Sequence, residues 1–173
     1  MTLASRIAVM KDGILQQFDT PQNIYERPNN MFVAGFIGSP SMNFINATLS
    51  EDNGKLAVTI PRGGDPIVLP LFEAPESYHG YVGKDVVFGI RPEALTHKRT
   101  GSDEPGSQYV NFDSKVEVIE PTGADTMTMI EIAGKEIVAR VRPDRAPTPG
   151  ESMTFSADMS QISLFDPDTE LRI

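Results

Sequence analysis

Glu136-Ile-Val-Ala-Arg-Val-Arg142 is the stretch that indicates the fold class of this chain most directly. Its residues alternate in character, because Ile137, Ala139 and Val141 fall on one face while Glu136 and two arginines fall on the other. Successive side chains of a β-strand point to opposite faces, so this period of two predicts a strand with one buried and one solvated side.

The same character extends over the chain from Phe44 onward. Short runs rich in Val, Ile, Thr and Phe alternate with turn clusters, which is typical of an all-β barrel or sandwich. Asn53-Gly54 and Gly134-Lys135 predict tight hairpin turns, and the polar, aperiodic stretch Thr96–Gln108 predicts an exposed, mobile loop. The predicted strands are Phe44–Ser50, Lys55–Ile60, Pro66–Leu71, Asp85–Arg91, Val110–Glu120, Asp125–Ala133, Glu136–Arg142, Ser152–Ala157 and Ile162–Phe165.

The first part of the chain has a different, mixed character. Arg6–Asp19 predicts a β-hairpin that turns at Asp12-Gly13. Thr20-Pro21 predicts a helix start, with threonine as the cap and proline in the first helical position, and that helix should end near Arg27. A second short helix is predicted over Met31–Ile37, capped by Asn29 or Asn30 and ended by Gly38 and Pro40.

Composition and charge exclude several classes of protein. The 173 residues include no cysteine, which excludes disulfides, zinc–thiolate sites and a cysteine nucleophile. The net charge is −9, and residues 47–173 carry all of it, so nucleic acid and anionic membrane surfaces are disfavoured partners. No apolar run approaches the roughly 20 residues of a membrane-spanning helix, and the beginning of the chain lacks the apolar core of a signal peptide. We therefore expect a soluble, intracellular chain.

Motifs for chemistry are absent from the sequence. There is no G-x-x-x-x-G-K-[ST] phosphate loop, and Gly35–Gly38 and Gly63-Gly64 lack the lysine and hydroxyl that a phosphate cradle needs. His79 and His97 stand in no recognisable relation to a nucleophile. The sequence predicts no catalytic, cofactor-binding or metal-ligating residue, and leaves a mainly β domain with a small helical appendage.

Several strings, in order, resemble one family. Thr2–Pro28 resembles the end of the nucleotide-binding domain of ABC importer ATPases in the maltose, multiple-sugar and glycerol-3-phosphate branch, although Ser5 stands where that branch usually has aspartate. Asn30–Pro40 and Met42–Phe44 look like the junction into its regulatory domain. Three further strings are similar to the oligomer-binding-like TOBE module, with Ser163 in place of a frequent histidine: Phe88–Glu93, Val116–Gly123 and Ser163–Asp166.

The resemblance implies an architecture and a set of motif residues. Residues 1–43 would be the last part of a nucleotide-binding domain, a small α+β unit, and residues 44–173 an OB-fold-like TOBE β-barrel or sandwich. For the Arg-Pro-Glu motif a structural role is favoured, in which Pro92 sets a turn while Arg91 and Glu93 satisfy backbone groups at the barrel end. The motif residues with a structural or regulatory role would be Gly89, Arg91, Pro92, Glu93, Thr122, Gly123, Phe165 and Asp166.

The resemblance also implies a function. The chain would be the regulatory and dimerisation domain of an ATP-driven importer of a sugar, a polyol or glycerol-3-phosphate. The family's ATP-binding motifs would lie before Met1, so ATP and Mg²⁺ would belong to a full-length parent and we expect no ATP turnover by this chain. Its partners would be a second copy, the permease subunits and a regulatory protein, at the cytoplasmic face of the membrane without insertion. The alternative is a stand-alone OB-like module for a small ligand or an oxyanion.

Overall fold

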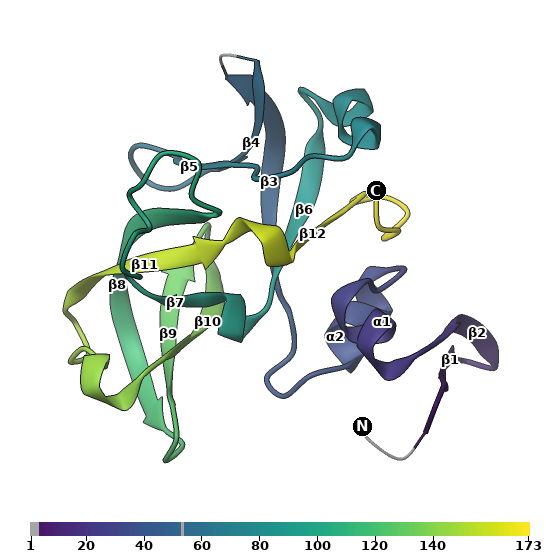
Figure 1. The fold of residues 1–173 in the computed structure, drawn as a ribbon, viewed down its shortest axis with the longest axis horizontal. Coiled ribbons are helices and arrows are strands. Elements are labelled where there is room, and N and C mark those ends of the chain that lie inside the picture. Colours follow the sequence, from purple (N-terminus) through teal and green to yellow (C-terminus); the bar gives the residue numbers. More distant parts are fainter. Residues whose placement is uncertain (1–3, 53) are drawn as a thin grey trace.

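The computed structural model describes residues 4–52 and 54–173, and it is built mainly of β-strands (Figure 1). A two-stranded hairpin and two short helices form the first part of the chain, and two five-stranded sheets form the rest. The predicted mainly β class with a small mixed N-terminal part is confirmed.

The N-terminal part follows its local sequence signals. Strands β1 (Ile7–Lys11) and β2 (Ile14–Asp19) pair antiparallel, and both turn residues between them have positive φ. Helix α1 (Pro21–Glu26) is capped by the Thr20 hydroxyl, which accepts the Asn23 N–H at 3.2 Å. Helix α2 (Met31–Phe36) is capped in the same way by Asn30. Both predicted helices are confirmed.

The first five-stranded sheet has the strand order β12-β6-β3-β4-β5 and is antiparallel throughout. A short 3₁₀-helix, η1 (Glu76–Tyr81), lies between its strands β5 and β6 in the chain. The strands of this sheet are β3 (Asn43–Asp52), β4 (Lys55–Ile60), β5 (Ile67–Pro70), β6 (Asp85–Ile90) and β12 (Ile162–Phe165).

The second sheet has the order β10-β9-β8-β11-β7 and curls until its two edge strands, β10 and β7, approach each other. Three single-turn 3₁₀-helices flank its strands: η2 (Pro92–Ala94) precedes β7, η3 (Pro143–Arg145) lies between β10 and β11, and η4 (Met159–Gln161) follows β11. Its strands are β7 (Leu95–His97), β8 (Tyr109–Pro121), β9 (Thr126–Ile132), β10 (Lys135–Val141) and β11 (Ser152–Asp158).

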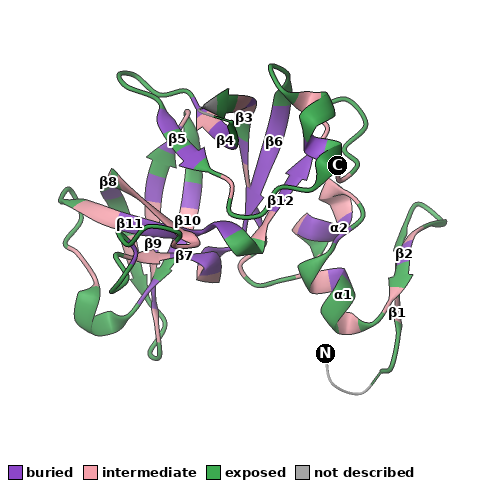
Figure 2. Ribbon diagram, turned by 45° about the horizontal axis from the view of Figure 1, so that its top comes forward, coloured by how far each residue is buried: buried purple, intermediate pink, exposed green. Residues whose placement is uncertain are grey.

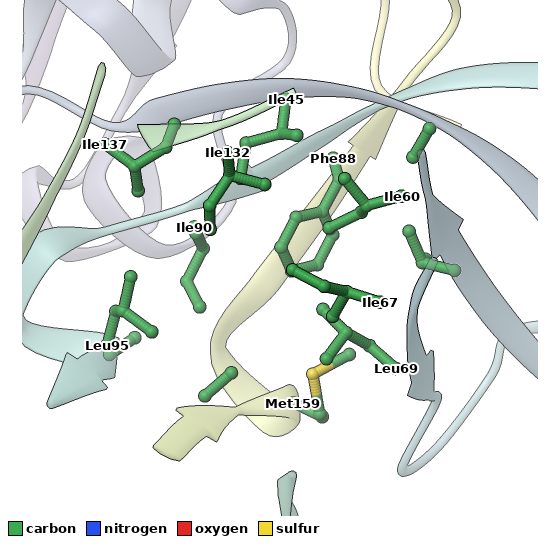
Figure 3. Packing of buried hydrophobic residues seen from close by; sticks show 14 of the residues in the cluster. Ile45, Ile60, Ile67, Leu69, Phe88, Ile90, Leu95, Ile132, Ile137 and Met159 are labelled. Carbon is green, nitrogen blue, oxygen red and sulfur yellow. The ribbon is translucent and has the colours of Figure 1, made fainter. Parts of the chain in front are cut away.

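One apolar core is shared by the two sheets. Phe88 and Ile45 of the first sheet lie in the same buried cluster as Ile132 and Ile137 of the second (Figure 3). A polar link also joins the sheets, since the amide of buried Asn43 donates to the Val138 carbonyl at 2.8 Å and accepts the Val138 N–H at 2.9 Å. Asn43 thereby satisfies backbone groups on the outer side of β10.

The loops and turns of the β part match the sequence predictions less closely than its strands do. Thr96–Gln108 is not entirely an exposed loop, because its first two residues belong to β7, which pairs with β11, and Ser102 is buried. The β9–β10 turn is centred on Ala133 and Gly134, both with positive φ, one residue earlier than predicted. In the predicted Asn53-Gly54 turn, Asn53 lies outside the described residues, and β3 and β4 pair on either side of it.

The burial pattern separates the two parts of the molecule. Buried residues concentrate in the two large sheets, whereas the β1–β2 hairpin is largely exposed and α1 and α2 lie between the hairpin and the sheets (Figure 2). Within the described residues, no helix is both long and apolar enough to cross a membrane.

Candidate functional site

The Arg-Pro-Glu motif lies where the helical part of the chain meets the β domain. Arg91 is 5 % exposed, and its guanidinium reaches across to the N-terminal segment. Nε and Nη2 donate to the Tyr25 carbonyl at 3.2 and 2.6 Å, and Nη1 donates to the Ile37 carbonyl at 2.8 Å. Both carbonyls stand at the ends of short helices, where backbone acceptors have no partner within the helix.

Tyr25 and Glu93 complete this contact. The guanidinium of Arg91 stacks on the Tyr25 ring, 3.7 Å from its centroid, and the Tyr25 hydroxyl donates to the Glu93 carboxylate. Burial and this hydrogen bond raise the pKa of the Tyr25 hydroxyl to about 12. We call Tyr25, Arg91 and Glu93 the junction cluster, since they tie α1 to the end of β6.

Pro92 and Gly89 shape the backbone around the junction cluster. Pro92 occupies the first position of η2, where its missing N–H leaves no partner unsatisfied. Gly89 sits beneath Met42 and Phe165, so a Cβ added there would lie 2.7 Å from the Met42 sulfur and 2.8 Å from a Phe165 ring carbon. Only glycine allows this close approach.

A second small core lies beside the junction cluster. Phe165 is fully buried and meets the ring of Phe44 edge-on, with centroids 5.7 Å apart. Ala34 of α2 and Met42 belong to the same buried cluster. Phe165 therefore joins α2 to the first sheet by apolar contact, next to the polar contact that Arg91 makes.

The C-terminal turn begins at Asp166. Its Oδ1 accepts the backbone N–H groups of Asp168 and Thr169 at 3.0 and 2.8 Å, and these bonds lower the pKa of the carboxyl group. Beyond the turn, the Arg172 N–H donates to the Asn29 carbonyl, and the Met31 N–H donates to the Glu170 carbonyl, both at 3.0 Å. The last residues of the chain therefore hydrogen-bond to the backbone at the start of α2.

Thr122 and Gly123 lie apart from the junction cluster. They form the turn between β8 and β9, where the Thr122 N–H and hydroxyl donate to the Asp125 carbonyl at 2.8 and 2.9 Å and Gly123 has a φ of 94°. Asp125 in turn pairs with Arg140. Six of the eight predicted motif residues therefore surround the junction between the helices and the sheets, and two form a hairpin turn.

Tyr25 and Asn43 make contacts between parts of the fold that the sequence did not predict. Tyr25 lies within a predicted helix, and nothing in its local sequence indicates that its partner Arg91 lies 66 residues away. Asn43 directly precedes the first predicted strand of the β domain, a place where asparagine ordinarily indicates only a turn.

Comparisons with protein families identify the two halves of the β part. The family "MalK OB fold domain" matches residues 38–95, and the family "TOBE domain" matches residues 88–165. The chain contains a MalK OB fold domain and a TOBE domain. The two matches overlap at residues 88–95, the segment that includes the Arg-Pro-Glu motif, and they confirm the predicted OB-like TOBE architecture.

Curated relatives match the whole of the chain. They include the uncharacterized ABC transporter ATP-binding protein y4oS of Sinorhizobium fredii, 40% identical over 174 residues, and the oligosaccharides import ATP-binding protein MsmX of Bacillus subtilis, 36% identical over 176 residues. The sulfoquinovosyl glycerol transport ATP-binding protein SmoE of Agrobacterium fabrum is 37% identical over 178 residues. Each alignment covers 100% of this chain but only 42%, 46% and 45% of the respective relative.

These relatives confirm the resemblance, since the chain is related over its full length to ABC transporter ATP-binding proteins, sugar-importer ATPases among them. The chain spans less than half the length of these relatives. Among solved structures, the cytoplasmic molybdate-binding protein ModG with molybdate bound matches with a TM-score of 0.50 and 22% identity, over 72% of this chain and 96% of that one. This likeness supports the fold alone.

Proposed function

We propose that this chain is the regulatory and assembly module of the ATP-binding subunit of an ABC importer for a sugar, a polyol or glycerol-3-phosphate. In this proposal, residues 1–43 belong with the nucleotide-binding domain and residues 44–173 form the regulatory domain. The observation that carries it is the junction cluster. In it, Arg91 of the β domain binds the carbonyls of Tyr25 in α1 and of Ile37 after α2, and Glu93 binds the Tyr25 hydroxyl. A rigid connection of this kind would let a movement of one domain displace the other.

Exposed apolar side chains in the N-terminal part support the same proposal. Ile14, Leu15 and Phe18 are each more than half exposed, and Phe36 of α2 is 65% exposed. A partner that covered these side chains would remove apolar surface from water, which favours association. We assign them to contacts with the nucleotide-binding domain of the subunit, which would carry the ATP and Mg²⁺ sites.

The remaining partners follow from the same role. A second copy of the subunit would meet this one through the β domain in a homodimer, and permease subunits would hold the dimer at the cytoplasmic face of the membrane. The names of the relatives support an import system for carbohydrate-like solutes, since MsmX is named for oligosaccharides and SmoE for sulfoquinovosyl glycerol.

A chimera tests the proposal. The chain replaces the region of the Bacillus subtilis relative with which it aligns, and oligosaccharide uptake is measured in cells that lack the native relative. We expect uptake with the native chain and with Lys55→Ala, which removes an exposed charge on β4. With Arg91→Ala, which releases both carbonyls at the junction, we expect a marked loss. A chimera that folds and hydrolyses ATP but imports nothing with the native chain would contradict the proposal.

The alternative of a small-ligand or oxyanion module has one observation in its favour. A basic hollow lies beside β7, and its lining includes Lys98, Arg99, Arg142 and Arg145. Because the full-length relatives are ATP-binding subunits, we treat this hollow as a feature of the importer module.

A further inference from the structure

A hollow in the molecular surface lies beside β7. It has a volume of about 760 Å³, within the usual range for a site that holds a small molecule. Two segments distant in sequence form it, the end of β7 with the loop that follows, and the region around η3. Its lining residues are Thr96, His97, Lys98, Arg99, Thr100, Gly101, Asp103, Arg142 and Arg145.

The charge of this hollow is opposite to that of the molecule. Lys98, Arg99, Arg142 and Arg145 contribute four positive charges, and Asp103 with the neighbouring Asp144 contributes two negative charges, which leaves +2. The whole chain has a net charge of −9. A local concentration of cations on a molecule of negative net charge attracts a compact anion, since at physiological ionic strength charges beyond about 8 Å are largely screened.

Neighbouring groups hold these cations in place. Arg142 makes two hydrogen bonds to Asp144, at 2.9 and 3.1 Å, and the Lys98 amine lies 2.6 Å from an Asp103 oxygen. The Arg99 guanidinium stacks over the Tyr109 ring, 4.7 Å from its centroid. Side chains that are already ordered lose less entropy when a ligand binds.

His97 lies close to several of these charged groups. Burial lowers the pKa of its imidazole, and Arg142 and Arg145 lower it further, while Asp144 acts in the opposite direction. At the wall of the hollow, His97 Nδ1 lies 3.1 Å from the Thr96 hydroxyl. The hydroxyl-bearing residues Thr96 and Thr100 line the same wall.

We propose that this hollow binds a small phosphorylated metabolite, with its phosphate on the arginines and lysine and its sugar or polyol hydroxyls on the threonines. Guanidinium groups match the geometry of phosphate oxygens, and hydroxyl groups match a polyol. A long polyanion such as a nucleic acid is disfavoured, because it would extend over the acidic surface around the hollow. The inference rests on the proposed function, in which the ligand would regulate import from the cytoplasmic side.

Titration calorimetry on the whole chain tests this site. The probes are glucose 6-phosphate, inorganic phosphate and glucose, at low and at physiological ionic strength. We expect glucose 6-phosphate to bind more tightly than inorganic phosphate, glucose to show no binding, and affinity to fall as salt is added. Tighter binding of inorganic phosphate than of glucose 6-phosphate would overturn the proposal that the threonines bind the sugar hydroxyls. The hollow would then be a site for free phosphate.

Variants separate the hollow from general charge attraction. Arg142→Ala and Arg145→Ala are expected to weaken glucose 6-phosphate binding about tenfold each. Lys55→Ala removes the same charge at a distance and should leave affinity unchanged, and unchanged thermal melting shows that each variant is folded. Equal weakening by all three variants, or no binding of any phosphate at millimolar concentration, would overturn the proposal. If the chimera imports oligosaccharide but the chain binds no phosphate compound, only the inference about the hollow is wrong. If the chain binds glucose 6-phosphate but the chimera does not import, only the proposed importer role is wrong.

Discussion

Arg91 performs three tasks at the junction. It donates to the carbonyls of Tyr25 and Ile37, stacks on the Tyr25 ring and carries a charge next to Glu93. Lysine would keep the charge, but its single ammonium group lacks the planar fork and the stacking face. The chemistry of the contact therefore requires arginine and not merely a cation.

We expect Arg91→Lys to lower the free energy of unfolding by about 2 kcal/mol, because a buried carbonyl loses its charged donor. Urea denaturation measures this difference. Arg145→Lys is the matched control, since the side chain of Arg145 is 66% exposed, and it should change stability by less than about 0.5 kcal/mol. Equal effects of the two substitutions would show that the junction contacts add no stability.

Tyr25 gives the junction cluster a dependence on alkaline pH. Its pKa is about 12 in the folded chain and 10.0 as the ordinary value, so the folded state retains the proton more tightly. Stability from this group is fully present below pH 10 and is lost as the pH rises through 12. Burial also raises the pKa of Tyr78 and Tyr81, so the wild-type curve alone does not isolate Tyr25.

The comparison with Tyr25→Phe isolates it. We expect the variant to lose less stability than the wild type between neutral and strongly alkaline pH, measured by denaturation at each pH. An ultraviolet absorbance titration should also lose the tyrosine that ionises near pH 12. Identical pH curves for the two proteins would contradict the assignment.

At this scale the sequence predicted only part of the role. Arg91 and Glu93 were expected to satisfy backbone groups at the barrel end. Arg91 does bind carbonyls, but those of Tyr25 and Ile37, and Glu93 accepts the Tyr25 hydroxyl, which is a side-chain group. Local patterns describe neighbours along the chain, whereas this contact joins residues 66 positions apart. The family resemblance identified the Arg-Pro-Glu motif, whereas the contacts of Arg91 with Tyr25 and Ile37 became known only from the structure.

At the scale of elements, strand β6 depends on the absence of a side chain at Gly89. We expect Gly89→Ala to destabilise the chain by roughly 1–3 kcal/mol, because the added methyl group would overlap Met42 and Phe165. Thermal and urea denaturation measure the loss. Gly63→Ala is the control, since a Cβ there meets no atom within 4 Å, and a loss as large as that of Gly89→Ala would refute the crowding argument.

Strands that form an apolar run bounded by turn residues were predictable, and a strand defined only by its partner was not. Lys55–Ile60 and Ile162–Phe165 were predicted with their observed bounds. Strand β7 was missed because it contains three residues, of which only Leu95 is fully buried, and its identity comes from pairing with β11. The helices were predictable because their caps, Thr20 and Asn30, are local signals.

At the scale of the whole molecule, net charge should govern self-association. Two copies of a chain with a charge of −9 repel each other, and added salt screens this repulsion. If the proposed homodimer forms through the β domain, sedimentation analysis should show it strengthening from low to physiological ionic strength. A strict monomer at high protein concentration and moderate salt would count against the homodimer.

The C-terminal turn offers a practical handle on the junction. Because Arg172 and Glu170 bond to the residues around the start of α2, a fluorophore attached to an added cysteine after Ile173 would sit beside the contact between the helices and the sheets. The 173 residues contain no cysteine, so such a label would attach to this chain at a single place. Its emission would report in real time whether the two parts of the molecule separate during a transport cycle.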